Sequence, residues 1–500
     1  MNSTVKMALI FLALMALVCG CGDSGTDSDD EGVIIYVDVA AEADGDGTQE
    51  TPFDAIGDAL VAARAGDLIN IAAGTYETNE TFPLELKPGV IVKGTGAVET
   101  VIIGGFLDTA VSDTLPVELH HMSFESLLFG RGEAPAAPSG INLVKKCTIG
   151  GDVTINHGGG HHFTIDSSII QGNIVISHGE GDSKNTVTNS SMGHLTLNNG
   201  AGAMVNVIRD NYIDGDIDFS NGAGATDTIS GNEISASLDY RSGASEAVIS
   251  DNEITGGQIY DASGGGEQLI TGNSISSTLG REDRDSAAIV AIGMGCTIKN
   301  NTITANEVMS GIIAQSGATT VIDSNTITVV GDNYGIYTVS GAGQIVGNII
   351  TGGEYGLYDK SGATDVSYNT ITSSDIGVYT QGAGRYHHNT ITLSLIDGMR
   401  LDGVTGPIDS NTVTNNGANG IRIVSGVVDL GGGADGGVGG NVIRNNPAFD
   451  LVNGTTGSIK AENNRWTHDT ESEIDSNDIK DDDEEGSSGY VDFVPFLVSK

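Results

Sequence analysis

Residues 369–389 read NTITSSDIGVYTQGAGRYHHN, and this stretch decides the fold. It holds three short runs in which apolar and polar residues alternate, at 370–372, 377–380 and 385–387. Alternation with a period of two is typical of β-strands rather than helices. Because the stretch begins at Asn369 and an equivalent unit begins at Asn389, it predicts one solenoid turn of three strands with an Asn at a sharp corner.

The same unit repeats along most of the chain, as an Asn two positions before an Ile or Val. Its positions, mostly 20 to 24 residues apart, are Asn211, Asn232, Asn252, Asn273, Asn301, Asn325, Asn348, Asn369, Asn389, Asn411 and Asn441, with Cys147, Ser167 and Ser190 in the same register upstream and Asn464 downstream. Such periods indicate a solenoid. Coils stack at about 4.8 Å, so we expect each Asn side chain to bond its own backbone and the equivalent Asn one rung away. A leucine-rich horseshoe is the alternative, but its Leu pattern is missing.

The prediction is therefore an all-β fold: a single-stranded parallel β-helix with three sheets, roughly 16 coils and a cap at each end. For the first cap we predict a helix that Thr51 caps and Pro52 begins, with Ile56, Leu60 and Ala63 on one apolar face. We divide the chain into 1–20 (signal peptide), 21–32 (acylated Cys and polar tether), 33–105 (amino-terminal cap and first coils), 106–460 (repeats) and 461–500 (carboxy-terminal cap).

The amino terminus predicts export. Lys6 precedes an apolar run, residues 7–18, that is too short for a bilayer span of about 20 residues. The run ends in LVCGC, which resembles the lipobox of bacterial lipoproteins and implies acylation of Cys21. An ordinary cleaved signal with incidental cysteines is the alternative. The lipobox implies a protein anchored by lipid to the cell envelope, at the outer membrane or cell surface. Two cysteines, Cys147 and Cys296, remain in the mature part, and we predict that both are unpaired, buried thiols.

Composition limits the partners. Asp plus Glu total 66 against 22 Lys plus Arg, a formal charge of -44, which repels nucleic acid phosphates and anionic lipid headgroups. We therefore expect no nucleic acid partner, and membrane contact only through the lipid anchor. Uronate polymers would also be repelled unless calcium or a local cationic patch intervened. Calcium is thus a possible but not a certain cofactor, and we expect a monomer.

Both ends of the chain carry short motifs outside the repeat. Residues 36–38, 45–48, 51–53 and 72–76 resemble the amino-terminal cap module, a domain of unknown function, found in bacterial β-helix proteins of the pectate-lyase-like superfamily. Residues 463–466 and 491–497 resemble the closing segment of such proteins. The resemblance covers residues 33–500 and implies a right-handed β-helix. The superfamily includes lyases, hydrolases, epimerases, adhesins and phage tailspikes, so the fold alone does not settle function.

In that superfamily the functional surface is usually the sheet that follows the turn after the Asn corner. The third residue of each strand there should face solvent. Asp218 and Asp239 occupy this position, and they form an acidic zone together with Asp216, with His194 one coil before and with Arg241 beside them. Carboxylates on neighbouring rungs can lie about 5 Å apart, as in a retaining glycosidase, or hold calcium for a lyase whose base would be Arg241 or His194. The alternative is a solvated acidic surface.

Further along the same column come Tyr260 and then three tyrosines followed by two arginines: Tyr337, Tyr358, Tyr379, Arg400 and Arg422. They would form a flat stripe for sugar rings, with guanidinium groups to meet carboxylates or sulfates. Alternatively, the tyrosines only stabilise the strand ladder. A loop at residues 280–285 could overhang this column as a wall.

Histidines and loop aspartates give weaker signals. His157 and His178 share a turn column, which indicates turn chemistry more than a metal site. Of His387 and His388, one should face inward and one outward. Asp429 and Asp435 lie in a Gly-rich loop that could bind calcium or be a surface turn.

Three functions remain open. The preferred one is binding of extracellular or cell-wall polysaccharide along the tyrosine and arginine column, in the service of adhesion. The second is a polysaccharide lyase or glycoside hydrolase acting at the acidic zone, and the third is a structural surface spacer.

Overall fold

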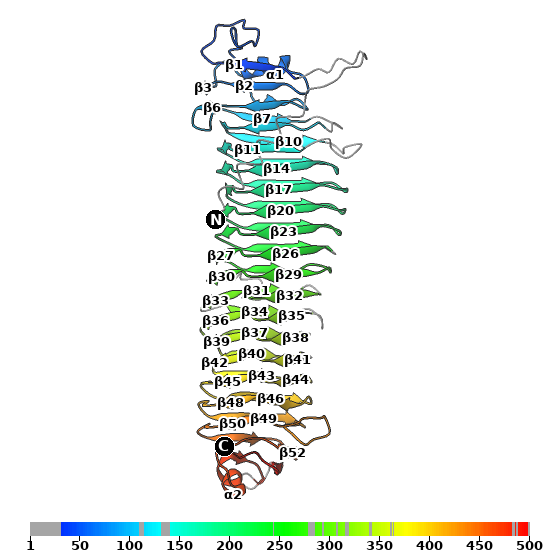
Figure 1. The fold of residues 1–500 in the computed structure, drawn as a ribbon, viewed down its shortest axis with the longest axis vertical. Helices are drawn as coiled ribbons and strands as arrows, with labels where there is room; N and C mark the ends of the chain where they lie inside the picture. Colours follow the sequence, from blue (N-terminus) through cyan, green and yellow to red (C-terminus); the bar gives the residue numbers. More distant parts are fainter. Residues whose placement is uncertain are drawn as a thin grey trace, which may run out of the picture.

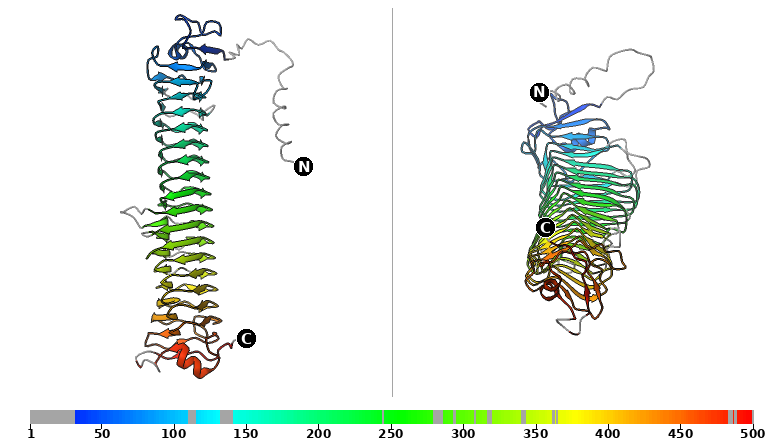
Figure 2. Two further views of the ribbon diagram at one scale, coloured as in Figure 1. Left: turned by 90° about the vertical axis from the view of Figure 1, so that its left-hand side faces the viewer. Right: turned by 60° about the horizontal axis from the view of Figure 1, so that its bottom comes forward.

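The computed structural model describes residues 32–109, 115–131, 141–243, 245–278, 286–292, 295–306, 309–315, 320–339, 343–360, 363, 365–482, 486 and 489–498. The predicted signal peptide, Cys21, the tether up to residue 31 and the loop at 280–285 lie outside these residues. The described chain is one long parallel β-solenoid with very little helix (Figures 1 and 2), which confirms the predicted fold class.

Three parallel sheets run the length of the molecule, and we call them A, B and C. The strands of sheet A are β1 (Ile34–Val37), β2 (Leu68–Ile71), β5 (Ile91–Lys93), β8 (Glu118–His120), β11 (Asn142–Lys145), β14 (His162–Asp166), β17 (Lys184–Thr188), β20 (Val205–Arg209), β23 (Thr226–Ser230), β26 (Glu246–Ser250), β29 (Gln268–Thr271), β32 (Cys296–Lys299), β35 (Val321–Asp323), β38 (Gln344–Val346), β41 (Asp365–Ser367), β44 (Arg385–His387) and β47 (Ile408–Asp409).

Sheet B begins just after the Asn corner in each repeated coil. Its strands are β3 (Gly74–Tyr76), β6 (Thr100–Ile102), β9 (Ser123–Phe124), β12 (Thr148–Ile149), β15 (Ile169–Ile170), β18 (Ser191–Met192), β21 (Tyr212–Ile213), β24 (Glu233–Ile234), β27 (Glu253–Gly256), β30 (Ser274–Ser277), β33 (Thr302–Asn306), β36 (Thr326–Val330), β39 (Ile349–Gly352), β42 (Thr370–Thr372), β45 (Thr390–Thr392), β48 (Thr412–Thr414) and β50 (Val442–Arg444).

Sheet C follows sheet B in each coil. Its strands are β4 (Leu84–Glu85), β7 (Gly105–Asp108), β10 (Ser126–Arg131), β13 (Val153–His157), β16 (Ile174–His178), β19 (Leu195–Asn199), β22 (Ile217–Asn221), β25 (Leu238–Ser242), β28 (Ile259–Asp261), β31 (Ala287–Ala291), β34 (Ser310–Ala314), β37 (Tyr334–Thr338), β40 (Tyr355–Asp359), β43 (Ile376–Thr380), β46 (Met399–Val404), β49 (Asn419–Gly426), β51 (Phe449–Asn453) and β53 (Ile479–Lys480).

The core is a stack of inward-facing apolar side chains, one set per rung. The middle residue of the sheet B strands illustrates it, because Ile303, Ile327, Ile350, Ile371 and Ile391 are all fully or almost fully buried. These isoleucines pair in register from one strand to the next. Uniform side chains in one column keep the sheet regular, so the outward residues are also held in straight columns.

An unbroken asparagine ladder runs along one corner from Asn211 to Asn464. In a typical rung, Asn369 Nδ2 donates to Asn389 Oδ1 at 2.9 Å and to Ile345 O of the preceding coil at 2.9 Å. Asn389 Nδ2 also donates to His387 O of its own coil at 3.2 Å. The predicted double bonding of the corner Asn is thus confirmed, and it satisfies buried polar groups that would otherwise cost free energy.

Just before this corner the backbone is left-handed, with positive φ at Asp210, Asp251 and Ser324 among others. Upstream, Cys147 and Ser190 stand at the ladder position as predicted. Only Ser167 is one residue out, because it occupies the left-handed position with φ 53°. Ser168 is the ladder residue, since its Oγ accepts from Cys147 N and its own N donates to Ser190 Oγ.

The first cap contains helix α1 (Ile56–Ala62), whose buried residues include Ile56, Ala59 and Leu60, as the predicted apolar face requires. The predicted cap residue is wrong. Thr51 bonds Asp46 instead, and the helix starts at Ile56, where Glu80 accepts from Ile56 N at 2.6 Å and from Gly57 N at 3.0 Å. A carboxylate 24 residues away therefore satisfies the free N–H groups of the first turn.

The far end is closed by α2 (Glu471–Glu473), the π-helical η2 (Ile474–Asp478) and the small sheet of β52 (Ile459–Lys460) and β54 (Val491–Asp492). Trp466 is buried there, with its ring edge-on to Phe493 at a centroid distance of 6.5 Å. The two motifs that we assigned to the closing segment thus meet in the structure.

Cys147 and Cys296 are free and buried, which confirms the prediction of two unpaired thiols. Burial raises the pKa of Cys147 to about 12, so its thiol stays protonated and unreactive.

The ladder predicts a measurable stability loss. In Asn369→Ala, the partners of the lost amide stay buried, and each unsatisfied group costs about 1–3 kcal/mol. The urea midpoint should therefore fall, whereas the exposed Asn198→Ala on β19 should leave it unchanged. Equal midpoints for the two variants would contradict a stabilising role of the ladder.

Candidate functional site

The outward third-position column of sheet C is continuous. Its register runs from Thr196 through Asp218, Asp239 and Tyr260. Val290 and Ile313 fill the two coils before Tyr337. Both are almost fully buried and pack with Ala287 against Tyr260 and Tyr337, so an apolar cluster separates the acidic zone from the tyrosines.

In the acidic zone, Asp218 and Asp239 lie side by side on neighbouring strands, as predicted. Asp239 is buried and pairs with Arg241, with Nε to Oδ1 at 3.0 Å. The Arg241 guanidinium also lies 5.7 Å from the centroid of the Tyr260 ring. Arg241 is thus bound to a carboxylate, and its pKa is raised chiefly by the Asp239 hydrogen bond, which makes it a poor candidate for a base.

Asp216 and His194 belong to a second ladder, in the turn before sheet C. His194 Nδ1 accepts from Asp216 N at 3.0 Å, and Asp216 Oδ1 accepts from Ser237 N at 2.9 Å. The chain of bonds continues in both directions through Asn173 and Ser237 Oγ. These side chains therefore join successive rungs, and their catalytic role stays a prediction.

The tyrosine zone is larger than predicted. Five rings gather on three adjacent strands, and we call them the tyrosine ladder: Tyr334, Tyr337, Tyr355, Tyr358 and Tyr379. Tyr334 and Tyr355 are new, since only third positions were aligned. The sequence could have indicated both, because each stands three residues before an aligned tyrosine.

The ladder is stepped rather than flat. The centroids of Tyr337 and Tyr358 are 5.1 Å apart with planes at 28°, and those of Tyr358 and Tyr379 are 4.9 Å apart at 40°. Coplanar rings are too wide for a rung spacing of about 4.8 Å, so the rings tilt and overlap in offset stacks. The predicted flat stripe is therefore wrong in shape, although each ring is half-buried and keeps part of its surface in solvent.

Four phenols of the ladder have a raised pKa. Burial, and next the charge of Glu354, raises the pKa of Tyr355 to about 12. Burial is also the largest cause that raises the pKa of Tyr334, Tyr358 and Tyr379. These four phenols thus stay neutral at physiological pH.

At the end of the ladder, Arg400 and Arg422 converge on one buried carboxylate. Arg400 Nη2 lies 2.7 Å and Arg422 Nε 3.2 Å from Asp397 Oδ2, and Asn419 Nδ2 donates to Asp397 Oδ1 at 2.7 Å. The two guanidinium groups are therefore held in place. Together with Asp397 they carry a net charge of +1 instead of +2.

Beside the arginines lies a polar cluster that the sequence did not reveal. Tyr379 Oη donates to Asp402 Oδ2 at 3.1 Å, Gln381 Nε2 donates to Tyr379 Oη at 3.0 Å, and Ser425 Oγ donates to Asp402 Oδ1 at 2.5 Å. Most of these groups are exposed, so a ligand could exchange bonds with them.

The structure confirms that His157 and His178 share a column, but it contradicts the prediction for His387 and His388. His157 and His178 share a column but point inward, with their Nδ1 atoms 2.9 Å apart, and burial lowers the pKa to about 2 for His157 and about 4 for His178. His387 and His388 both face outward, contrary to our prediction, because the strand ends at His387 and His388 takes the left-handed corner.

The metal predictions gain no support. Within the described ranges, no group of three or more His, Cys, Asp or Glu is placed to hold a metal ion. Asp429 instead organises its Gly-rich loop, because its carboxylate accepts from the backbone of Gly431, Gly433 and Gly437.

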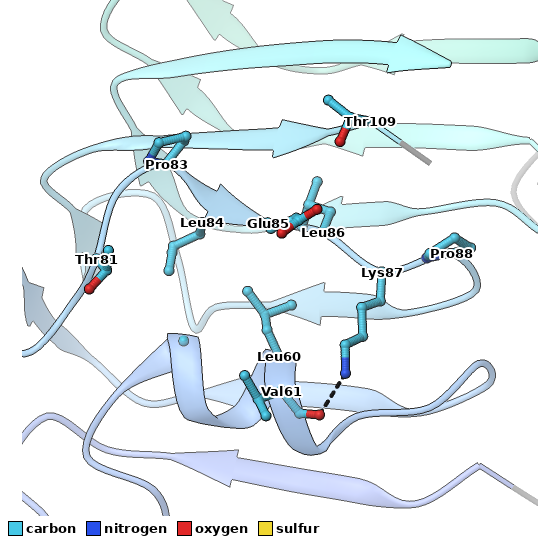
Figure 3. Close-up of a pocket in the computed structure, with 11 residues that line it drawn as sticks. Leu60, Val61, Thr81, Pro83, Leu84, Glu85, Leu86, Lys87, Pro88 and Thr109 are labelled. Atoms are coloured by element: carbon cyan, nitrogen blue, oxygen red, sulfur yellow. Dashed lines mark hydrogen bonds between the residues drawn. The ribbon is translucent and has the colours of Figure 1, made fainter. Parts of the chain in front are cut away.

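A separate pocket of about 460 Å³ lies between α1 and the first strands of sheet C (Figure 3). Its lining is mostly aliphatic, with Leu60, Val61 and Leu84 among others. The one lysine in it, Lys87, is occupied, since its Nζ donates to Val61 O at 2.6 Å and to Ala63 O at 3.2 Å at the end of the helix. This pocket is remote from the columns described above.

No helix in the described part of the chain is long and apolar enough to cross a membrane. Two family models match: "Protein of unknown function (DUF1565)" over residues 39–109, and "Right handed beta helix region" over residues 240–396. The chain thus carries a right-handed β-helix region preceded by this uncharacterised module, in agreement with the motifs at its amino-terminal end.

No curated protein sequence matches the chain. Among solved structures, similarity is found to the A-module of a mannuronan C-5 epimerase from Azotobacter vinelandii, with 16% identity, coverage of 79% of this chain and 98% of the other, and a TM-score of 0.22. A periplasmic alginate epimerase shows 10% identity, coverage of 86% of this chain and 74% of the other, and a TM-score of 0.20. A tailspike protein of an E. coli bacteriophage shows 13% identity, coverage of 77% of this chain and 72% of the other, and a TM-score of 0.20.

The role of Asp397 as the anchor of Arg400 and Arg422 can be tested directly. Asp397→Asn should lower the free energy of unfolding by about 1–3 kcal/mol, since one neutral amide cannot accept from both guanidinium groups and Asn419. Thermal unfolding measures this loss. The control is Asp375→Asn. Asp375 is half-buried and directly precedes β43, the strand of sheet C next to β46, and its replacement should change the melting temperature little. An unchanged melting temperature for Asp397→Asn would refute the anchor.

Proposed function

We propose that this chain is a surface-anchored lipoprotein that binds polysaccharide along sheet C. The tyrosine ladder is the observation that carries the proposal. Five tyrosine rings lie on three adjacent rungs, and the exposed polar groups of Gln381, Asp402 and Ser425 lie at one end. Aromatic surface with a few placed polar groups is the usual make-up of a binding site for uncharged ligands with both apolar and hydroxyl faces.

The arrangement favours a polymer that lies along the solenoid axis. Rungs rise by about 4.8 Å, so three tyrosine strands and the two arginine strands that follow offer contacts over about 20 Å. A single sugar ring would cover only one or two rungs. A chain would meet the tyrosines first and then the Asp402 cluster and the arginines.

Charge favours a neutral or weakly acidic glycan. The two arginines share Asp397, and Asp402 and Glu354 lie beside the ladder. These two arginines and three carboxylates leave a local net charge of -1, while the whole chain carries -44. A densely charged polyanion would be repelled by the rest of the molecule unless calcium screened it.

The lipid anchor would present the solenoid outside the cell, which suits adhesion. Cys21→Ser should release the protein from the membrane fraction, because serine lacks the thiol to which the lipid would be attached, while the variant keeps the rest of the export signal. Fractionation and metabolic labelling with a radioactive fatty acid measure this. A variant that is still labelled and sediments with membranes would contradict lipidation at Cys21.

An enzyme is the second candidate, and the adjacent carboxylates of Asp218 and Asp239 favour it. As a polysaccharide lyase or glycoside hydrolase, the protein would use these residues with Asp216, and calcium could serve a lyase. Newly formed chain ends distinguish catalysis from binding. A purely structural spacer would show neither retention nor new ends.

The binding proposal is tested on immobilised xylan, laminarin, chitin, alginate and pectate, with and without calcium, with retention and new chain ends both recorded. We expect retention without cleavage, and a loss of affinity of about tenfold or more, on the order of 1.4 kcal/mol, for Tyr337→Ala/Tyr358→Ala. Tyr212→Ala, an exposed tyrosine of β21 on sheet B, is the control and should bind normally.

Two outcomes would overturn the proposal. Cleavage that disappears in Asp218→Asn/Asp239→Asn would make the protein an enzyme of the acidic zone. Equal retention of the ladder variant and the Tyr212 variant would place the bound glycan elsewhere.

A further inference from the structure

Sheet B carries a second ordered surface, on a different face from the tyrosine ladder. From β33 to β48, threonine occupies nearly every outward position of the strands, which form the left-hand edge of the lower half of Figure 1. We call this surface the threonine face. Its first column is Thr302, Thr326, Thr370, Thr390 and Thr412, with Ile349 in one rung, and its second column is Thr304, Thr328, Thr351, Thr372, Thr392 and Thr414.

The two columns form a regular lattice. Every rung from β30 to β48 pairs residue for residue without a register shift. Beneath them, buried Ile or Val fills the middle position of each strand, and the asparagine ladder fixes the adjacent corner. The threonines therefore repeat at about 4.8 Å between rungs and at about 6.6 Å along each strand.

The hydroxyls of this lattice are free for an external partner. Apart from a contact of 3.4 Å between Thr372 and Ser373, no hydrogen bond joins these side chains to another group within the described residues. All of them are exposed or half-buried. Each threonine side chain, with its hydroxyl and its methyl group, thus keeps part of its surface in solvent.

The face also has no charge, although 18% of the whole chain is charged. Between β30 and β48, none of the outward positions in these described strands holds Asp, Glu, Lys, Arg or His. Ionisable residues reappear at its two limits, as Glu253 on β27 and Arg444 on β50. Aromatic residues, which grip sugars on sheet C, are missing from the same strand positions.

Water in ice has a matching geometry. Hydrogen-bonded water oxygens lie about 2.75 Å apart, so a tetrahedral network has second neighbours at about 4.5 Å and an axial repeat of about 7.3 Å. Both values are within about 0.7 Å of the threonine lattice. Hydroxyls on such a lattice can take the place of water oxygens, while the methyl groups occupy the spaces between them. Charged groups would instead organise water around themselves.

We propose that the threonine face binds ice. The ligand is the ordered lattice of solid water, and the two columns supply rows of hydroxyls that are nearly commensurate with it. This activity is independent of polysaccharide binding, because sheets B and C present different faces of the solenoid.

The test uses the purified full chain with a fluorescent label, and ice crystals grown in dilute buffer as the probe. We expect the protein to be enriched in the ice fraction and to inhibit ice recrystallisation. Thr370→Lys/Thr390→Lys places two charges on adjacent rungs and should reduce both effects several-fold. The matched control is Thr164→Lys/Thr186→Lys, on adjacent rungs of sheet A, which should behave like the parent.

If the lysine variant unfolds at a lower temperature than the parent, Thr370→Ala/Thr390→Ala takes its place, since it only removes groups from the surface and should also weaken ice binding. The proposal is overturned if the parent is excluded from ice, or if the folded variants bind ice as the parent does. Retention on crystalline cellulose but not on ice would also overturn it and assign the face to a solid polymer.

Discussion

The asparagine ladder is the constraint on which the rest of the molecule depends. Each amide bonds the next rung and the backbone of a neighbouring coil, so all rungs from Asn211 to Asn464 share one register at one corner. A strand that slipped by one residue would turn every side chain to the opposite face. Because the ladder prevents this, columns of identical residues extend over many coils, and a short repeat in the sequence becomes a long uniform surface.

The three sheets use that register differently. Sheet C has an acidic zone, an apolar cluster around Val290 and Ile313, and then the tyrosine ladder. Sheet B has the uncharged threonine face beside the ladder corner. Alternate residues of each strand face inward and outward, and each coil adds one row of outward residues to every sheet. One solenoid can therefore carry binding surfaces for two ligands of different chemistry.

Much of the fold could be predicted from the sequence because it rests on local pattern. The expected strands at 370–372 and 385–387 coincide with β42 and β44. Contacts between residues far apart in the chain could not be predicted from the sequence. Glu80, not Thr51, caps α1, and Asp397 neutralises part of the arginine charge. The tyrosine column was predicted, but Tyr334, Tyr355 and the tilt of the rings follow from rung spacing and ring width together. The threonine columns follow directly from the repeat, in which Thr stands on both sides of Ile371 and Ile391.

The central functional claim is that ligand recognition lies on the outward column of sheet C at the tyrosines and not at the carboxylates. Peptide-level hydrogen–deuterium exchange, with and without the polysaccharide that is retained best, tests it most directly. The account predicts slower exchange in β37, β40, β43 and β46 on binding, and unchanged exchange in β22 and β25. Protection of β22 and β25 with no change at the tyrosine strands would contradict it.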